Sequence, residues 1–180
     1  MDAARELYGE KGIEHTTILD ITERLGVTRT LFYHYFPNKH DLTLAVLDSY
    51  VADYLEALEL WNENRPQGDI DQALQNLVKL LRLCVFDKDS FYTSLVSNVN
   101  VELHTAFANR VAEHTTNYIL ETTVKDYASL HDIKIDHLYE TFYMLIVGAI
   151  GYLRTHPETD DAIIADVIAQ TLYLERPNKL

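Results

Sequence analysis

Residues 12–42 read GIEHTTILDITERLGVTRTLFYHYFPNKHDL, and this stretch decides the fold of the N-terminal part of the chain. Thr17 is followed three positions later by Asp20, a capping-box pattern typical of a helix start. Gly26 ends the first apolar periodic segment and is the residue type that tolerates a left-handed turn conformation. Thr28 can cap a second, short helix. Two helices joined by so short a turn predict a helix-turn-helix.

The second of these helices has a polar start and a strongly aromatic remainder. Phe32 and Phe36 lie four positions apart and should face the core of a three-helix unit, and we interpret Tyr35 as a core residue too. Tyr33 and His34 then point away from that core. Their hydroxyl and ring N–H groups suit phosphate oxygens.

The polar start of this helix has the chemistry of base readout. The Arg29 guanidinium can form a bidentate hydrogen bond to guanine in a major groove, and Thr28 and Thr30 can meet a thymine methyl or a base edge. Lys39 and the unpaired N–H groups of the following helix start predict an anion site for a further phosphate. Thr17 and Thr28 can also be helix caps alone, a role compatible with phosphate contact.

These residues together resemble the N-terminal domain of the TetR family of transcriptional regulators, and the run 33–39 after Gly26 and Val27 is the most specific part of the likeness. The resemblance implies an Ω-shaped homodimer in which each N-terminal domain reads half of a near-palindromic operator on double-stranded DNA. It also implies that a ligand in the C-terminal domain changes the spacing of the two domains and releases the DNA, most often from a repressor. Mapped onto this chain, the family's DNA contacts fall on Thr17, Thr28, Arg29, Thr30, Tyr33, His34 and Lys39.

The composition agrees with an all-α protein. The 180 residues include only six Gly and four Pro, and 47% are apolar, which favours helices around a buried core. The net charge of −13 for the whole chain disfavours binding to nucleic acid. Residues 1–45, however, contain five basic and seven acidic residues, so most of the negative charge lies after residue 45. We expect a DNA-binding domain over 1–46 and a helical ligand-binding and dimerisation domain over 47–180.

Helical spacing of apolar residues continues through the whole chain, and no alternating pattern indicates a sheet. The expected helices, about nine in number, cover residues 2–11, 18–25, 29–35, 39–62, 70–87, 90–99, 101–128, 135–155 and 160–174.

Targeting signals are lacking in the sequence. No run of 18 apolar residues occurs, the first residues lack a signal-peptide core, and the single Cys84 suits a reducing compartment. We therefore expect a cytoplasmic protein without a membrane partner.

The last two long helices are expected to form the dimer interface. Gly in a helix interior costs about 1 kcal/mol relative to Ala, so small residues amid an apolar helix indicate a close helix–helix approach. That approach could instead lie inside one subunit. The interface residues expected are Leu145, Gly148, Ala149, Gly151, Tyr152, Ile164, Val167, Ile168 and Thr171.

A pocket for a largely apolar small molecule is expected in the C-terminal domain, because an apolar cavity with a few polar tips is the usual form of a ligand site. The same residues could instead be plain core. The candidate lining residues are Cys84, Phe91, Tyr92, Leu95, His104, Phe107, His114, Tyr118, Tyr139 and Tyr143.

Two other functions are alternatives to this interpretation. His131, Asp132, Asp136 and His137 resemble scattered metal ligands of an enzyme, but no third ligand has a fixed spacing, and no nucleophile stands beside a base. We expect no catalytic residue, metal or cofactor. The second alternative is an interaction or architectural module that has lost ligand control, which the absence of a cavity would support.

Overall fold

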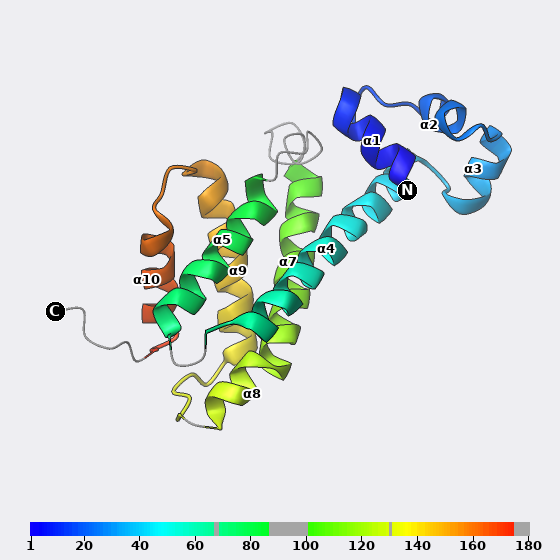
Figure 1. The fold of residues 1–180 in the computed structure, drawn as a ribbon. Helices are drawn as coiled ribbons and strands as arrows, with labels where there is room; N and C mark the ends of the chain where they lie inside the picture. Colours follow the sequence, from blue (N-terminus) through cyan, green and yellow to red (C-terminus); the bar gives the residue numbers. More distant parts are fainter. Residues whose placement is uncertain (67–68, 87–100, 130, 175–180) are drawn as a thin grey trace. The chain divides into compact units, whose positions relative to one another are not determined.

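The computed structural model describes residues 1–66, 69–86, 101–129 and 131–174, and within these ranges the chain is helical with no strand (Figure 1). The expected all-α class is confirmed. The helices are α1 Asp2–Lys11, α2 Ile18–Leu25, α3 Arg29–Tyr35, α4 Lys39–Asn64, α5 Ile70–Phe86, α7 Val101–Glu121, α8 Thr123–Ala128, α9 Leu138–Thr155 and α10 Asp161–Thr171.

Most expected helices lie within a few residues of their observed bounds, with three differences. The helix expected over 101–128 is interrupted at Thr122, where the backbone leaves helical geometry (φ −119°, ψ −85°), so that α7 and α8 are separate. The helix expected from 135 begins at Leu138, and the last one ends at Thr171. The helix expected over 90–99 lies outside the described residues.

The helix starts follow the capping chemistry read from the sequence. The Asp41 backbone N–H donates to the Asn38 side-chain oxygen at 2.9 Å ahead of α4. The Gln72 N–H likewise donates to the Asp69 carboxylate at 3.0 Å ahead of α5. These caps satisfy N–H groups that have no partner inside the helix.

The contacts divide the chain into two compact units, which we call unit 1 and unit 2. Unit 1 comprises residues 1–53 and 86–107, and unit 2 comprises 54–85 and 108–180. The division falls inside α4, whose first half belongs to unit 1 and whose second half belongs to unit 2.

Unit 1 has a small core that fixes α3 against its neighbours. Phe32, one of the residues expected there, is buried together with Leu7, Ile21 and Leu42. The hydroxyl of the fully buried Tyr8 lies 2.8 Å from that of Thr43, so this ring has a hydrogen-bonding partner inside the core.

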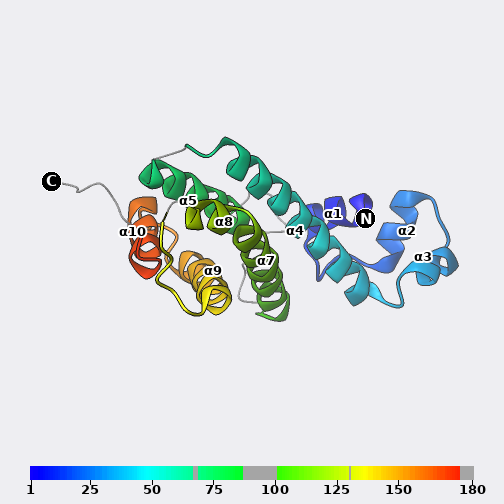
Figure 2. The same ribbon diagram turned by 90° about the horizontal axis from the view of Figure 1, so that it is seen from below.

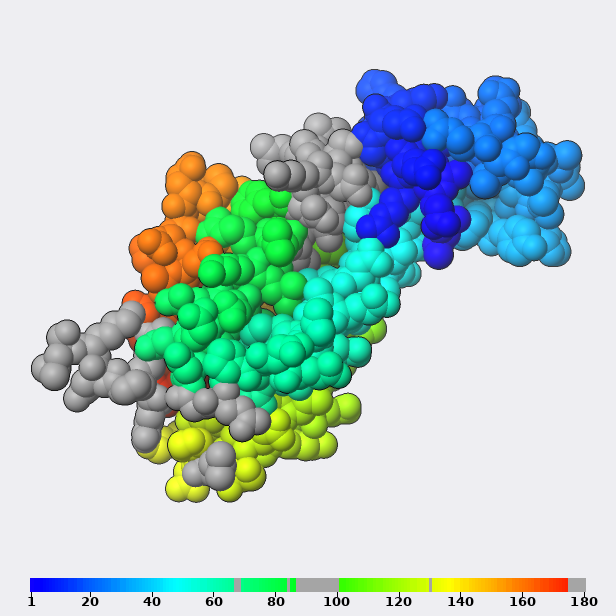
Figure 3. Space-filling view, viewed as in Figure 1, coloured from blue at the N-terminus to red at the C-terminus, as the bar shows by residue number. Residues whose placement is uncertain are grey.

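Unit 2 is a helical bundle in which α5, α7, α9 and α10 surround a common interior (Figure 2). The second half of α4 lies beside α5, as the space-filling view shows (Figure 3), and the Trp61 indole N–H donates to the Ala73 carbonyl at 3.2 Å. The Arg82 guanidinium of α5 donates to the Asp161 carboxylate at 2.7 Å and to the Pro157 carbonyl at 2.6 Å. Arg82 therefore ties α5 to the connection between α9 and α10.

Within the described part of the chain, no helix is both long enough and apolar enough to cross a membrane.

Candidate nucleic-acid interface

The turn between α2 and α3 has the backbone geometry that the sequence predicts. Gly26 adopts a left-handed conformation (φ 65°, ψ 31°) directly after α2. Its N–H donates to the Glu23 carbonyl at 3.1 Å, and the Val27 N–H donates to the Thr22 carbonyl at 3.0 Å. These bonds end α2 and change the direction of the chain, so that α3 can begin at Arg29.

The N-terminus of α2 is closed by a complete capping box. The Asp20 N–H donates to the Thr17 hydroxyl at 3.1 Å, and the Thr17 N–H donates to the Asp20 carboxylate at 2.7 Å. The Lys11 ammonium also binds this carboxylate at 2.7 Å. The bonds from Lys11 and Thr17 hold the pKa of Asp20 well below its usual range. Thr17 is thus an N-cap, as predicted.

The outer face of α3 presents the residues expected to contact DNA. Arg29, Thr30, Tyr33 and His34 are exposed, and Thr28 caps the helix by accepting from the Leu31 N–H at 3.3 Å. The inner face is held by Phe32, against which the ring of Tyr33 packs edge-on at 5.4 Å.

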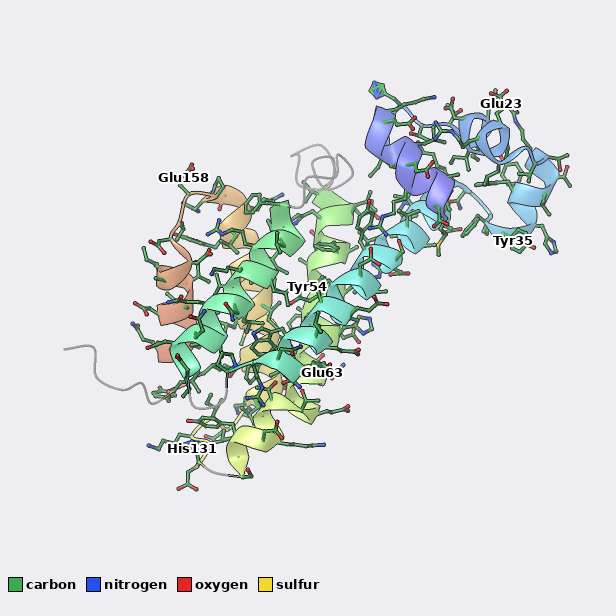
Figure 4. All side chains as sticks on the ribbon, viewed as in Figure 1. Glu23, Tyr35, Tyr54, Glu63, His131 and Glu158 are labelled. Atoms are coloured by element: carbon green, nitrogen blue, oxygen red, sulfur yellow. The ribbon has the colours of Figure 1, made fainter. Side chains whose placement is uncertain are left out.

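Tyr35 does not lie in the core, which corrects the sequence interpretation. It is 69% exposed and points outward from the end of α3 (Figure 4). The helix turns 100° per residue, so the buried Phe32 and the half-buried Phe36 leave Tyr35 on a different face. Sequence reasoning missed this exposed phenol because it grouped the aromatic residues by type rather than by helical phase.

Arg29 and Tyr33 of α3 meet the start of α2 at a shallow hollow. The hollow has a volume of about 320 Å³ and is lined by Thr17, Ile18, Leu19, Arg29 and Tyr33. Three of the predicted DNA-contacting residues from two helices therefore border one surface depression.

Arg29 differs in its bonding from the other four Lys and Arg residues of residues 1–46. Arg5 pairs with Asp53 at 2.6 Å and lies over the Tyr50 ring at 3.7 Å. Lys11 pairs with Asp20, and Arg24 with Glu10, at 2.7 Å each. Lys39 donates to backbone carbonyls. Only Arg29, among the Lys and Arg side chains of these described residues, makes no ion pair or hydrogen bond.

Lys39, expected at a phosphate site, has a structural role in this conformation. Its ammonium donates to the carbonyl of Ile13 at 2.9 Å and to that of Thr16 at 3.0 Å. An ammonium has three protons, so one remains for an external acceptor.

Comparison with known proteins supports this view of the N-terminal domain. Residues 1–46 match the model of the family described as bacterial regulatory proteins, tetR family. Residues 1–46 are thus similar to the N-terminal domain of TetR-family regulators. A relative is the HTH-type transcriptional regulator TtgR of Pseudomonas putida, 43% identical over 49 residues, which are 27% of this chain and 23% of TtgR. The chain thus matches only about a quarter of that relative's length.

Two solved structures have a fold similar to that of this chain. The repressor AlkX from a Dietzia species superposes with a TM-score of 0.68 at 19% identity, covering 96% of this chain and 92% of AlkX. Thermus thermophilus FadR, solved in complex with lauroyl-CoA, gives a TM-score of 0.62 at 20% identity, covering 99% and 95%.

The TetR-like bundle of unit 2 contains a cavity of about 1190 Å³. All its lining residues belong to unit 2. Its apolar lining includes Trp61 of α4, Leu77 of α5, Ile119 of α7, Phe142 of α9 and Ile168 of α10. A volume of this size accommodates a drug-sized molecule.

The predicted ligand residues that the structure describes do not line this cavity, which corrects the expectation for them. His104 and Phe107 are buried in unit 1, whereas His114 and Tyr139 are exposed. Tyr118 and Tyr143 are half-buried outside the cavity lining, the latter stacked on Tyr139 at 6.0 Å. Phe91, Tyr92, Leu95 and the Cys84 side chain lie outside the described residues. The prediction chose polar and aromatic residues, whereas the cavity is lined mostly by aliphatic ones.

The predicted dimer residues fall on two different faces. Ile164 and Ile168 are buried, and Leu145, Ala149 and Ile168 line the cavity, so these four face the interior of unit 2. This corrects their assignment to the interface. Outward-facing members are Gly148, Tyr152, Val167 and Thr171, with Gly151 half-buried. Both faces of α9 are apolar, so composition alone could not separate them.

The alternative that Gly148 permits a tight contact inside one subunit is not supported. A Cβ atom added at Gly148 or Gly151 would meet nothing within 4 Å in the described structure. Likewise, no group of three or more His, Cys, Asp or Glu side chains that could hold a metal occurs among the described residues.

Proposed function

We propose that this protein is a DNA-binding transcriptional regulator that recognises a near-palindromic operator as a homodimer and is released from it by a small molecule. The observation that supports DNA recognition best is the exposed, unpaired Arg29 at the start of α3, beside Thr17 and Tyr33. An unpaired guanidinium can form the bidentate hydrogen bond to guanine without breaking an internal ion pair.

The other exposed groups of α3 fit contacts to the DNA backbone. Tyr33, His34 and Tyr35 offer hydroxyl and ring N–H donors around Arg29, and phosphate oxygens accept from such groups. Thr30 lies beside Arg29 on the exposed side, where it can meet a base edge. The remaining proton of the Lys39 ammonium can serve one further phosphate.

Dimerisation is proposed through the outward face of α9 and α10. Met144 and Tyr152 of α9 are 67% and 45% exposed, and Ile163 and Val167 of α10 are 55% and 49% exposed. Gly148 lies between Met144 and Tyr152 on the same face of α9, with open space above it. Exposed apolar side chains beside a glycine suit close packing against a second copy of the chain.

Ligand control is supported by the cavity in unit 2, because the alternative of a module without ligand control predicts none. Thermus thermophilus FadR, which has a similar fold, was solved in complex with lauroyl-CoA, which supports a small-molecule effector. Release of DNA then requires that the ligand binds more tightly to one arrangement of the two N-terminal domains than to the other. The action as a repressor in the cytoplasm is part of this proposal.

Selection of bound duplexes from a random DNA pool tests the proposal. The expected product is a sequence with two related half-sites in inverted orientation, each containing a guanine whose replacement weakens binding. Recovery of unrelated sequences with no symmetry would contradict the proposal. The selected duplex then permits a search for molecules that release it.

A further inference from the structure

The cavity of unit 2 contains an unused hydrogen-bonding group. Thr115 of α7 is only 2% exposed and lines the cavity, and its hydroxyl has no hydrogen-bond partner among the described residues. A buried hydroxyl without a partner is unfavourable, because its lost hydration is not replaced. Threonines in helices commonly satisfy the hydroxyl on a carbonyl one turn earlier, as Thr105 of the same helix does on the Val101 carbonyl at 2.8 Å. Thr115 makes no such bond, so a cavity-lining residue keeps an unused hydroxyl donor.

Charge is confined to one end of the cavity. Apart from tyrosines, the charged and titratable lining residues are Arg65, at the end of α4, Asp126 of α8, and His131, Asp132 and Lys134 in the segment after α8. Figure 4 shows His131 at the α8 end of unit 2, away from Tyr54. Arg65 and Asp126 pair with each other at 2.7 Å. The opposite charges at this end balance, and the rest of the lining contains no charged side chain.

We infer that the cavity takes an uncharged, largely apolar molecule with a carbonyl or hydroxyl oxygen that accepts a hydrogen bond from Thr115. The apolar walls favour burial of hydrocarbon, whereas an ionised ligand group inside them would lack a counter-charge and lose its hydration. One hydrogen bond to Thr115 would then fix the orientation of the molecule. This inference names the effector class and so rests on the ligand-dependent part of the proposed function.

Thr116 provides a matched control on the same helix. Its hydroxyl is also buried without a partner, but Thr116 does not line the cavity. Thr115→Val and Thr116→Val each replace a hydroxyl by a methyl group of nearly equal size. Both remove an unsatisfied polar group, so both variants should fold at least as stably as the wild type. Thr115→Ser keeps the hydroxyl and should keep ligand binding.

The probe is Nile red, an uncharged apolar dye with a carbonyl oxygen whose fluorescence rises in apolar surroundings. The full chain should bind it saturably, Thr115→Val should bind it about three- to tenfold more weakly, and Thr116→Val and Thr115→Ser should match the wild type. Failure of the wild type to bind the dye would overturn the inference. So would equal affinity of Thr115→Val, or an equal loss in Thr116→Val.

Competition with three molecules of equal chain length tests the charge assignment. We expect 2-undecanone to displace Nile red at a lower concentration than undecanoate or undecyltrimethylammonium. A charged competitor that displaces the dye as well as the ketone does would overturn the assignment. Dye binding is measured without DNA, and DNA binding of the ligand-free protein is measured without dye, so failure of this inference is distinguishable from failure of the proposed regulation.

Discussion

The ammonium nitrogen of Lys39 lies 2.9 Å from the backbone carbonyl oxygen of Ile13, although 26 positions separate the two residues in sequence. A second bond, to Thr16, joins the same ammonium to the residue before the N-cap of α2. The first residue of α4 thus holds the segment that positions Thr17 and one edge of the α2–α3 hollow. Lys39 can therefore contribute to DNA binding even without touching DNA.

Replacement of Lys39 by Met should separate this structural role from surface charge. The variant keeps most of the apolar stem but removes the ammonium donor from two carbonyls, so the free energy of unfolding should fall by about 1–3 kcal/mol. Binding to all duplexes should weaken alike. Chemical denaturation and fluorescence anisotropy measure the two effects. Lys79→Met, at an exposed position of α5, should change neither, and wild-type stability of Lys39→Met would refute the role.

The Asp20 carboxylate predicts a pH-dependent contribution to stability. Its pKa is lowered in the folded chain by Lys11 and Thr17. The unfolded chain holds this carboxyl at a pKa of about 3.9. Because the pKa is lower in the folded chain, ionised Asp20 stabilises the fold at pH values above about 3.9. This stabilisation is lost as the pH falls from there through the pKa of the folded chain. The Tm of the wild type should therefore exceed that of Asp20→Asn at pH 7, and the difference should shrink below about pH 4. Glu14→Gln is the control, and a difference independent of pH would contradict the prediction.

If the outward face of α9 forms the dimer interface, a charged side chain placed on it should prevent dimerisation. Gly148→Arg adds a long cation where the structure of one chain has open space, so the fold should survive while a second copy is excluded. Helix propensity favours the variant by up to about 1 kcal/mol, which further protects the fold. Light scattering coupled to size exclusion should show a dimer for the wild type and a monomer for Gly148→Arg.

The control for the dimer prediction is Leu60→Arg, which places the same cation at a 62% exposed position of α4. This variant should remain dimeric. A Gly148→Arg protein that is still a dimer would locate the interface elsewhere.

The bonds of Arg82 to the connection between α9 and α10 are expected to contribute to the free energy of unfolding. Its guanidinium donates to Asp161 and to the carbonyls of Pro157 and Thr159. Arg82→Met removes all these bonds at a site that is about one quarter exposed, so the free energy of unfolding should fall by about 1–3 kcal/mol. Arg82→Lys, which reaches fewer of these oxygens, should lose an intermediate amount in urea denaturation. Equal stability of the wild type, Arg82→Met and Arg82→Lys would show that these bonds do not stabilise the fold.

Local signals predicted the N-terminal helices well because their causes are local. The Thr17–Asp20 box, the left-handed Gly26 and the Asn38 cap each act within a few residues of the chain. Partners far apart in sequence left no such signal. Nothing near Lys39 indicates that its ammonium binds Ile13 and Thr16, because that contact depends on how α1, α2 and α4 pack.

The cavity was expected in the correct domain but with the wrong residues. Its walls are aliphatic side chains such as Leu77 and Ile119, which sequence reasoning treats as core. Polar residues such as His114 looked functional but face outward. The hydroxyl of Thr115 became significant only when its burial and lack of a partner were known.

The most direct test of DNA recognition compares Arg29→Ala with Arg24→Ala. Both variants remove one guanidinium from the N-terminal domain, but Arg24 is bound to Glu10 and Glu6, whereas Arg29 is unpaired on α3. Anisotropy titrations would use the selected operator and a duplex with its guanines replaced. We predict that Arg29→Ala loses about 1–3 kcal/mol of operator affinity and most of the preference between the duplexes, while Arg24→Ala keeps that preference. Unchanged discrimination by Arg29→Ala would contradict the central claim that this residue reads the DNA sequence.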